Sequence, residues 1–313
     1  MKVIRGLPLP QNKTPCALTI GNYDGVHKGH QVLLERLIAT AKEHHLQSCV
    51  LTFEPHPKEF FDPQNAPARI LNLRDKLVAL ERFGVDCVYV EHFNAAFAKK
   101  TPEVFVQEIL VNGLDAKKII IGDDFHYGSR RAGNINTLES AGKNFNFEVT
   151  SIPTILDNRQ QRISSSALRQ ALKEGQMDLA TTLLGRPYSI SGHVLHGRKL
   201  GRTLGFPTLN LMVSNQLHQR PHALSGIFVA LVHGLEAKPL PAVASLGVRP
   251  TVEDAGNVLL ETHVFDFKKE VYGKLVRVEL VKKLRDEKKY SSLDELTQAI
   301  QHDAQLAREY FKN

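Results

Sequence analysis

The residues best suited to chemistry lie in a glycine-rich segment near the start of the chain, Gly21–His30. This segment, Gly-Asn-Tyr-Asp-Gly-Val-His-Lys-Gly-His, follows a short apolar run and leads into a stretch of helical period. A turn between a strand and a helix N-terminus presents unpaired backbone N–H groups, which attract anions. His27 and His30 share one helical face, so their imidazoles can donate hydrogen bonds to a phosphate that gains charge at a transition state. The segment therefore predicts a phosphate site that also uses Gly21, Tyr23, Asp24 and Gly29.

Two other interpretations of the histidine pair are a metal site and a solvated helix start. A metal site needs a third ligand, and the sequence offers none at a useful spacing. The order of strand, glycine-rich turn and helix favours the anion site over both.

A run of serines between two arginines marks a second candidate phosphate site. Ser164 and Ser165 precede a predicted helix, with Arg162 before them and Arg169 after them. Hydroxyls at a helix start and a guanidinium can hold a pyrophosphate, although serines at this place are also ordinary N-caps. Asp123 follows an apolar run, at the kind of strand end where open α/β sheets bind ligands, and an acidic turn explains it equally well. Together with the histidine segment, these residues predict a site that binds both ends of a nucleoside triphosphate.

A basic, glycine-rich loop in the second half leads into a predicted strand. Alternation along that strand places Thr208 and Asn210 on one face, where their neutral oxygens can assist a Mg²⁺ ion already held by substrate phosphates. Glu261, near the start of a later strand, can act as a general base for an attacking hydroxyl. A polar strand face and an edge charge are the alternatives. The predicted nucleotide-binding positions are Gly201, Arg202, Gly205, Pro207, Thr208 and Asn210.

The elements that must position these residues differ between the two halves. The first half alternates β-branched apolar runs with helical patterns, which indicates an α/β domain with a parallel sheet. Its predicted strands are 17–20, 48–53, 86–90, 118–121 and 147–152. Apolar stripes over 34–41 and 73–80 predict two helices, and a third should begin at Pro102 after an N-cap at Thr101 and stop at Gly113. After Gly185-Arg186-Pro187, short strands with turns predict a mostly-β barrel or sandwich. A last helix is capped by Ser292, and its predicted apolar face consists of Leu293, Leu296, Ile300 and Ala304. We therefore predict domains at 1–186 and 187–313.

Length, composition and charge narrow the function classes. The 313 residues suffice for two domains, and no stretch is apolar enough for a membrane span or a signal peptide, so we expect a cytoplasmic protein. The three cysteines are too few and too widely spaced for a disulfide framework, and they predict small core residues. The net charge of +7 is spread over both halves without a basic block, which suits two sites for small phosphates better than a nucleic-acid surface.

Together these segments resemble the bacterial bifunctional riboflavin kinase/FMN adenylyltransferases, also called FAD synthetases, over nearly the whole chain. Besides the motifs above, the resemblance rests on segments that each match the family moderately: 52–57, 122–128, 247–251, 261–267 and 271–273. Three positions depart from the family pattern, namely Tyr23 for the usual Phe, Ser166 for Thr and Leu209 for Ala. None of them removes a group to which chemistry is assigned.

The resemblance implies a Rossmann-like nucleotidyltransferase domain followed by a riboflavin-kinase barrel. The barrel would phosphorylate riboflavin to FMN, with Thr208 and Asn210 at Mg-ATP and Glu261 as the base. The first domain would join AMP from ATP to FMN, with His27 and His30 at the α-phosphate and Ser164, Ser165 and Arg169 at the leaving pyrophosphate. The partners would be riboflavin, FMN, FAD and ATP rather than nucleic acid or membrane, and a homo-oligomer stays open.

An alternative is another H-x-G-H nucleotidyltransferase fused to a nucleic-acid-binding barrel. A relative of class I aminoacyl-tRNA synthetases would need a K-M-S-K-S-like lysine loop, which the sequence lacks. A nucleic-acid-binding barrel typically has strands that carry both basic and aromatic side chains, and the second half has no such strand.

Overall fold

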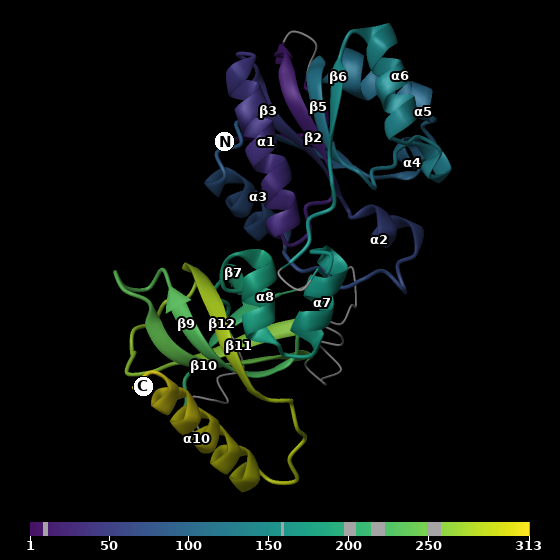
Figure 1. The fold of residues 1–313 in the computed structure, drawn as a ribbon. Helices are drawn as coiled ribbons and strands as arrows, with labels where there is room; N and C mark the ends of the chain where they lie inside the picture. The colour runs from purple at the N-terminus through teal and green to yellow at the C-terminus, as the bar shows by residue number, and fades with distance from the viewer. Residues whose placement is uncertain (9–11, 158–159, 197–204, 214–222, 249–257, 313) are drawn as a thin grey trace. The chain divides into compact units, whose positions relative to one another are not determined.

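The chain folds into two compact units, and the computed structural model describes residues 1–8, 12–157, 160–196, 205–213, 223–248 and 258–312. The first unit comprises residues 1–67 and 76–164, and the second comprises residues 68–75 and 165–313. Each unit has a sheet of its own, as Figure 1 shows.

The first unit is built on a parallel sheet of six strands in the order β1-β4-β3-β2-β5-β6. The five strands predicted from the sequence are present, and β1 at the edge is additional. The strands are β1 (Lys2–Arg5), β2 (Cys16–Ile20), β3 (Gln47–Glu54), β4 (Cys87–His92), β5 (Ala116–Gly122) and β6 (Glu148–Ile152).

Helices connect these strands. Besides α1 and α3, the unit contains α2, α4 and α6, which were not predicted, and a helix that begins at Pro102 after its Thr101 N-cap and ends at Gly113, as predicted. The second part of that helix, η2, is a π-helix. The helices are α1 (Lys28–Glu43), α2 (Pro57–Phe61), α3 (Leu73–Arg82), α4 (Ala95–Ala98), α5 (Pro102–Val104), η2 (Phe105–Gly113) and α6 (Ile135–Phe145).

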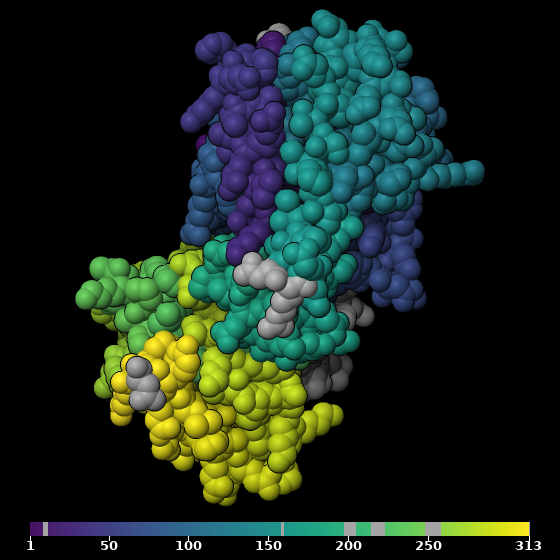
Figure 2. Space-filling model, viewed as in Figure 1, coloured from purple at the N-terminus to yellow at the C-terminus, as the bar shows by residue number. Residues whose placement is uncertain are grey.

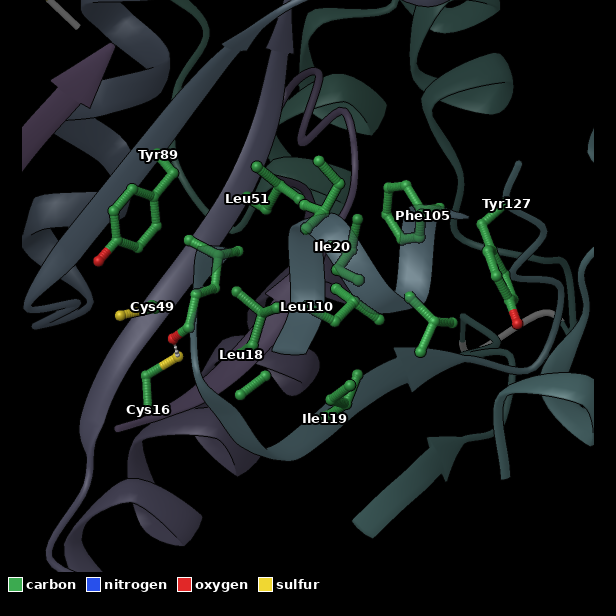
Figure 3. Close-up of a cluster of buried hydrophobic side chains, with 14 of the residues drawn as sticks. Cys16, Leu18, Ile20, Cys49, Leu51, Tyr89, Phe105, Leu110, Ile119 and Tyr127 are labelled. Carbon is green, nitrogen blue, oxygen red and sulfur yellow. Dashed lines mark hydrogen bonds between the residues drawn. The ribbon is translucent and has the colours of Figure 1, made fainter. Parts of the chain in front are cut away.

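The core of this unit lies on the face of the sheet that packs against η2. Leu18, Leu51 and Ile119 from three neighbouring strands meet Leu110 of η2, as Figure 3 shows. Alternate residues of the same strands, such as Thr19, point to the opposite face, and α1 contacts β2, β3 and β5. Because both faces of this parallel sheet are covered, side chains on both sides of each strand are buried, and the strands are continuous apolar runs in the sequence.

The three cysteines belong to this core, as predicted. Cys16, Cys49 and Cys87 are free thiols and are buried. The Cys16 Sγ donates a 3.4 Å hydrogen bond to the Leu114 carbonyl, drawn as a dashed line in Figure 3.

The strand order reverses at β2. The chain passes from β2 to β3 and β4 on one side, then crosses to β5 and β6 on the other. In open α/β sheets, ligands bind at the carboxyl ends of the strands beside such a reversal. The loops after β2 and β5 occupy that place, and they carry the predicted segments 21–30 and 122–128.

The second unit is an antiparallel sheet in the order β7-β12-β9-β10-β11-β8 that curls into a near-barrel. Its two edges meet where the Leu195 N–H donates a 2.8 Å hydrogen bond to the Asn210 carbonyl. The strands are β7 (Ser189–His193), β8 (Leu209–Met212), β9 (Gly226–His233), β10 (Leu240–Val248), β11 (Val258–Val264) and β12 (Leu275–Arg285). The structure therefore confirms the predicted order along the chain, an α/β half followed by a mostly-β half.

In the part of this unit that the structure describes, the helices are α7 (Ser165–Lys173), α8 (Met177–Leu184) and α10 (Leu293–Tyr310). Ser292 caps α10 by accepting a hydrogen bond from the Glu295 N–H, as predicted. The predicted apolar face of α10 is confirmed at Ala304, which is buried, and wrong at Leu293, which is 61% exposed, because the helix packs on the barrel near its C-terminal end, through Ala304 and Ala307. Figure 2 shows α10, in yellow, at the surface of the unit.

The two compact units divide at Ser164, earlier than the predicted domain boundary near Arg186. Helices α7 and α8 group with the barrel because α8 contacts β12. Residues 68–75 group with it as well, since the Tyr188 hydroxyl donates to the Ile70 carbonyl and the Ser191 N–H donates to the Asp75 carboxylate. The compact units are defined by packing, and the domain boundary near Arg186 stays a prediction from the sequence pattern.

Candidate active sites

The segment Gly21–His30 forms a tightly wound turn between β2 and α1. The Gly21 N–H donates to the Leu51 carbonyl of β3, and Tyr23 and Val26 adopt the left-handed conformation, with φ of 48° and 44°. Such conformations in residues other than glycine cluster at functional sites. The turn also buries polar groups that normally stay in water, with Asp24 only 4% exposed.

His27 and His30 lie together at the start of α1. His27 is the N-cap, and its Nδ1 accepts a 3.4 Å hydrogen bond from the His30 N–H. The two rings stack with their centroids 3.7 Å apart and their planes 19° apart. Because Nδ1 accepts, the proton of neutral His27 lies on Nε2, from which it can be donated to an anion.

His30 is held in its neutral form. Burial, and after it the charges of His27 and Lys76, lower its pKa well below the usual value. Its Nδ1 is a buried atom without a hydrogen-bond partner among the described residues, and so is the Oδ1 of Asn22 in the same turn. Buried polar atoms are nearly always paired in folded proteins, so two unpaired atoms in one turn indicate a place for a ligand.

Tyr23, the departure from the family pattern, is accommodated inside the fold. Its ring lies 4.9 Å from the His30 ring, and its hydroxyl forms a 2.6 Å hydrogen bond with Thr19 Oγ1. The residue is 1% exposed, and burial raises the pKa of the phenol far above its usual range. Tyr23 therefore supports the His30 ring from inside the core.

Part of the second predicted phosphate site lies against the first. A Cβ on Gly29 would lie 3.3 Å from the Ile163 carbonyl oxygen and 3.2 Å from the His27 ring. Only glycine leaves this approach unstrained, and it brings the backbone before Ser164 to the start of α1. The predicted neighbourhood of Gly29 and Ser164 is thus present within the first unit.

The acidic residues after β5 are engaged by other groups. Asp123 accepts hydrogen bonds from the N–H and the hydroxyl of Thr154, at 2.8 and 2.9 Å, and the Thr154 N–H lowers its pKa. Asp124 forms an ion pair with Arg162. Asp123 thereby fixes the segment after β6 to the end of β5, and Asp124 holds Arg162 at the same strand ends.

Ser165 and Arg169 belong to the second unit, at the start of α7. The Arg169 Nε donates a 2.7 Å hydrogen bond to the Ala68 carbonyl, so this guanidinium helps to hold residues 68–75 on the unit. The structure thus places Ser164 with the first unit and its neighbours Ser165 and Arg169 with the second.

Sequence reasoning missed Lys76 and a cluster of phenylalanines. Lys76 lies on α3, is 6% exposed and contributes to the electrostatic environment of His30. The phenylalanines lie near the end of β3 or after β3 and β4, and their rings contact one another edge to face or tilted. One of them, Phe61, is 66% exposed. The cluster consists of Phe53, Phe60, Phe61, Phe93 and Phe97. The sequence did contain a signal for Lys76: it lies three and four residues before Ala79 and Leu80, which places it on the buried face of a helix.

In the second unit, the structure brings Asn210 and Glu261 together. They are directly opposite one another in the antiparallel pair of β8 and β11, and Ser245 of β10 is opposite Glu261 on its other side. Residues opposite one another in an antiparallel pair project to the same face. Asn210 is 7% exposed, and its Nδ2 donates to the Thr208 carbonyl at 3.4 Å. The predicted base and the predicted magnesium ligand thus share one face of the barrel.

A second carboxylate lies on that face and was not predicted. Gly247 follows Ser245 at the same face of β10, and a Cβ there would overlap the Glu287 carboxylate at 1.9 Å. Burial and the charge of Glu261 raise the pKa of Glu287, while Arg285 lowers it. Glu287 therefore lies within electrostatic range of the predicted base.

The predicted binding loop is only partly described. Gly201 and Arg202 lie outside the described residues, whereas Gly205, Pro207 and Thr208 lead into β8. The Pro207 carbonyl lies 2.9 Å from His263 Nδ1, a contact that ties the loop end to β11. In the part of the chain that the structure describes, no group of three or more His, Cys, Asp or Glu side chains is arranged to hold a metal ion.

Comparison with known proteins finds a different family model for each half of the chain. Residues 9–167 match the family model for FAD synthetase, and residues 184–311 match the model for riboflavin kinase. The chain is 44% identical to a bifunctional riboflavin kinase/FMN adenylyltransferase of Haemophilus influenzae, over the full length of both proteins. It is 43% identical to the protein of the same name from Escherichia coli K12, over 99% of this chain and 98% of the relative.

Among solved structures, the chain resembles a crystal structure from Streptococcus pneumoniae described as a macrolide-efflux protein. The TM-score is 0.79 at 30% identity, covering 98% of this chain and 99% of that one. Within the described ranges, no helix of this chain has both the length and the hydropathy to cross a membrane. Both family models and the full-length relatives show that the chain belongs to the bifunctional riboflavin kinase/FMN adenylyltransferase family, with an N-terminal FAD synthetase domain and a C-terminal riboflavin kinase domain.

Proposed function

We propose that the chain converts riboflavin to FMN in the barrel and FMN to FAD in the α/β unit, using one ATP for each step. The first step releases ADP, and the second releases pyrophosphate. The observation that carries the proposal is the pair of unlike polar sites, one at the strand ends beside β2 and one on the face shared by Asn210 and Glu261. Both reactions are displacements at phosphorus that depend on positioning and charge stabilisation.

In the adenylyl transfer, a phosphate oxygen of FMN attacks the α-phosphorus of ATP, and the bond to the bridging oxygen of pyrophosphate breaks. Negative charge grows on the oxygens around phosphorus, where His27 and His30 donate hydrogen bonds. The turn residues Gly21, Tyr23, Asp24 and Gly29 line the phosphates, next to the N-terminus of α1. Asp123 holds the strand ends in place through Thr154.

The leaving pyrophosphate needs cationic and hydroxyl donors of its own. We assign this role to the serine and arginine groups that follow β6. The approach of the Ile163 carbonyl to Gly29 supports this for the nearest of them, because it places Ser164 beside the turn. The assigned residues are Arg162, Ser164, Ser165 and Arg169.

In the kinase step, the ribityl hydroxyl of riboflavin attacks the γ-phosphorus of ATP. Glu261 accepts the proton of that hydroxyl, and Thr208 and Asn210 orient the phosphates. The pairing of Asn210 with Glu261 across two strands supports this, since it brings base and phosphate ligand to one face. The loop residues Gly201, Arg202, Gly205 and Pro207 would cover the nucleotide.

The residues on that face suit Mg²⁺. Thr208 and Asn210 offer neutral hard oxygen atoms, and among the described residues no group of three or more His, Cys, Asp or Glu side chains converges to bind a metal by the protein alone. Magnesium typically takes few protein oxygens and completes its shell with water and substrate phosphates. When bound with ATP, the ion would neutralise charge on the β- and γ-phosphates.

Phe61, an exposed phenylalanine of the first unit, suits the flavin ring. Phe61 follows β3 at the same strand ends as the histidine turn, and it is backed by edge-to-face contacts with Phe60 and Phe93. Flat aromatic ligands stack on aromatic side chains. We assign Phe61 to the isoalloxazine ring of FMN.

Product analysis tests the proposal directly. The purified full-length chain is incubated with riboflavin, ATP and Mg²⁺, and the flavins are separated by chromatography. Both FMN and FAD should form, and FAD alone should form when FMN replaces riboflavin. A chain that forms neither product would contradict the proposal, and removal of Mg²⁺ with EDTA should stop both steps.

A further inference from the structure

Lys76 is buried among apolar neighbours next to the histidine turn. It lies on the face of α3 that also buries Ala79 and Leu80, and it is 6% exposed. Lysine is almost never buried this deeply unless its ammonium interacts with specific groups, because removing the charge from water is costly. The position therefore needs an explanation in terms of what the ammonium does.

The ammonium belongs to a chain of polar contacts that ends in the turn. Lys76 Nζ donates to Thr52 Oγ1 at 3.5 Å, and Thr52 Oγ1 donates to the Asn22 carbonyl at 3.4 Å. Thr52 is completely buried on β3, next to β2 in the sheet. Helix α3, strand β3 and the turn after β2 are thereby linked at the point where the turn leaves the sheet.

The same ammonium acts on His30. After burial, the charges of His27, the N-cap of α1, and of Lys76 lower the pKa of His30, and the Tyr23 ring lies 4.9 Å from the His30 ring. Two of these are cationic or can become so, which gives this spot a positive potential suited to an anionic phosphate. The unpaired Asn22 Oδ1 and His30 Nδ1 lie at the two ends of this arrangement.

We propose that Lys76 is a positioning residue of the adenylyl-transfer site: through Thr52 it fixes the turn at Asn22, and its charge favours a phosphate next to His30. The proposal deepens the function proposed above and rests on it. Neither the H-x-G-H motif nor the serine and arginine segment includes this residue.

The experiment compares full-length variants at this position with a matched control. Lys76→Met removes the charge and keeps the length of the side chain, Lys76→Gln removes the charge and keeps a polar end, and Lys76→Arg keeps the charge. Arg82→Met removes an exposed cation from the same helix. Each is assayed for FAD formation from FMN and ATP and, separately, for riboflavin phosphorylation.

We expect Lys76→Met and Lys76→Gln to lower kcat for FAD formation by about 100-fold, with a smaller change in KM and an unchanged kinase rate. Lys76→Arg should recover most of the rate, and Arg82→Met should match the wild type. Equal losses of both activities, or wild-type kcat in both neutral variants, would overturn the proposal. If neither neutral variant folds, the role of Lys76 is structural and the proposal is wrong.

An NMR titration of His30 separates the proposed role from simple packing. The ring C–H signal is identified by its absence in His30→Ala. Because a nearby positive charge disfavours the imidazolium, loss of Lys76 should let His30 take up its proton at a higher pH. An unchanged His30 titration in folded Lys76→Met would contradict the electrostatic part. A wild-type chain that makes FMN but no FAD would instead contradict the adenylyltransferase function.

Discussion

The two sites of this chain are built from different parts of their sheets. In the parallel sheet, the polar groups lie beyond the strands, in loops after β2, β5 and β6, and several are buried, such as His27. In the barrel, Asn210 and Glu261 lie within strands and meet through cross-strand pairing. Parallel strands bring all their carboxyl ends to one edge, whereas antiparallel strands bring residues together by register.

This difference has a consequence for how each site tolerates change. The first site depends on backbone conformation, on a glycine that admits a neighbouring carbonyl, and on buried groups fixed by the core. The second depends on which residue faces which across two strands, and a shift of register by one residue would move Asn210 and Glu261 to opposite faces. Selective substitutions should therefore impair one activity and leave the other unchanged.

The largest effect is expected at His30. His30→Ala removes the proposed donor to the α-phosphate, so FAD formation should fall by about 1,000-fold while riboflavin phosphorylation continues and FMN accumulates. Chromatography of the flavins measures both steps in one reaction. His44→Ala, at the exposed end of the same helix, is the control and should behave as the wild type. Equal loss of both activities in His30→Ala would show that the two sites are not independent.

Glu261→Gln should have the converse effect. Without the carboxylate, the ribityl hydroxyl loses its proposed proton acceptor, and the kinase rate should fall by about 100-fold while supplied FMN is still converted to FAD. Glu236→Gln serves as the control, because Glu236 is exposed and paired only at the surface with Lys269. A kinase rate that stays the same in Glu261→Gln would remove this residue from the role of base.

A smaller effect is expected from Gly29→Ala. The added methyl would lie 3.2 Å from the His27 ring and 3.3 Å from the Ile163 carbonyl oxygen, so the start of α1 must shift slightly. We expect a loss of about tenfold in FAD formation, because a small misplacement weakens donors that must be aligned. The control is Gly192→Ala in β7, where the nearest atom would be 3.7 Å away. Wild-type FAD formation in Gly29→Ala would show that the close approach at Gly29 is not needed.

The smallest effect is expected from Tyr23→Phe. The substitution removes the 2.6 Å hydrogen bond to Thr19 and leaves that hydroxyl buried, which should cost about 1 kcal/mol in the free energy of unfolding. Urea denaturation measures this cost, and replacing Thr19 by Val as well should recover part of it. The rate of FAD formation should not change, since the ring that supports His30 remains. A large loss of rate would mean that the hydroxyl serves the nucleotide after all.

The sequence by itself determined the local features. The spacing of His27 and His30 on one helix, the N-caps at Thr101 and Ser292, and the change from an α/β to a mostly-β pattern all follow from interactions within a few residues. Periods of 3.6 and 2 are imposed by backbone geometry, so they can be recognised without knowing what the segment packs against. The same local logic gave the three cysteines as core residues.

Only the tertiary structure decided which distant residues meet. It linked Lys76 through Thr52 to the turn at Asn22, and it placed the Ile163 carbonyl on Gly29, Asn210 opposite Glu261, and the Glu287 carboxylate over Gly247. It also grouped residues 68–75 with the barrel and left Leu293 of α10 exposed. These contacts depend on strand order, register and the packing of helices, which join segments far apart in the chain and leave no periodic signal in the sequence.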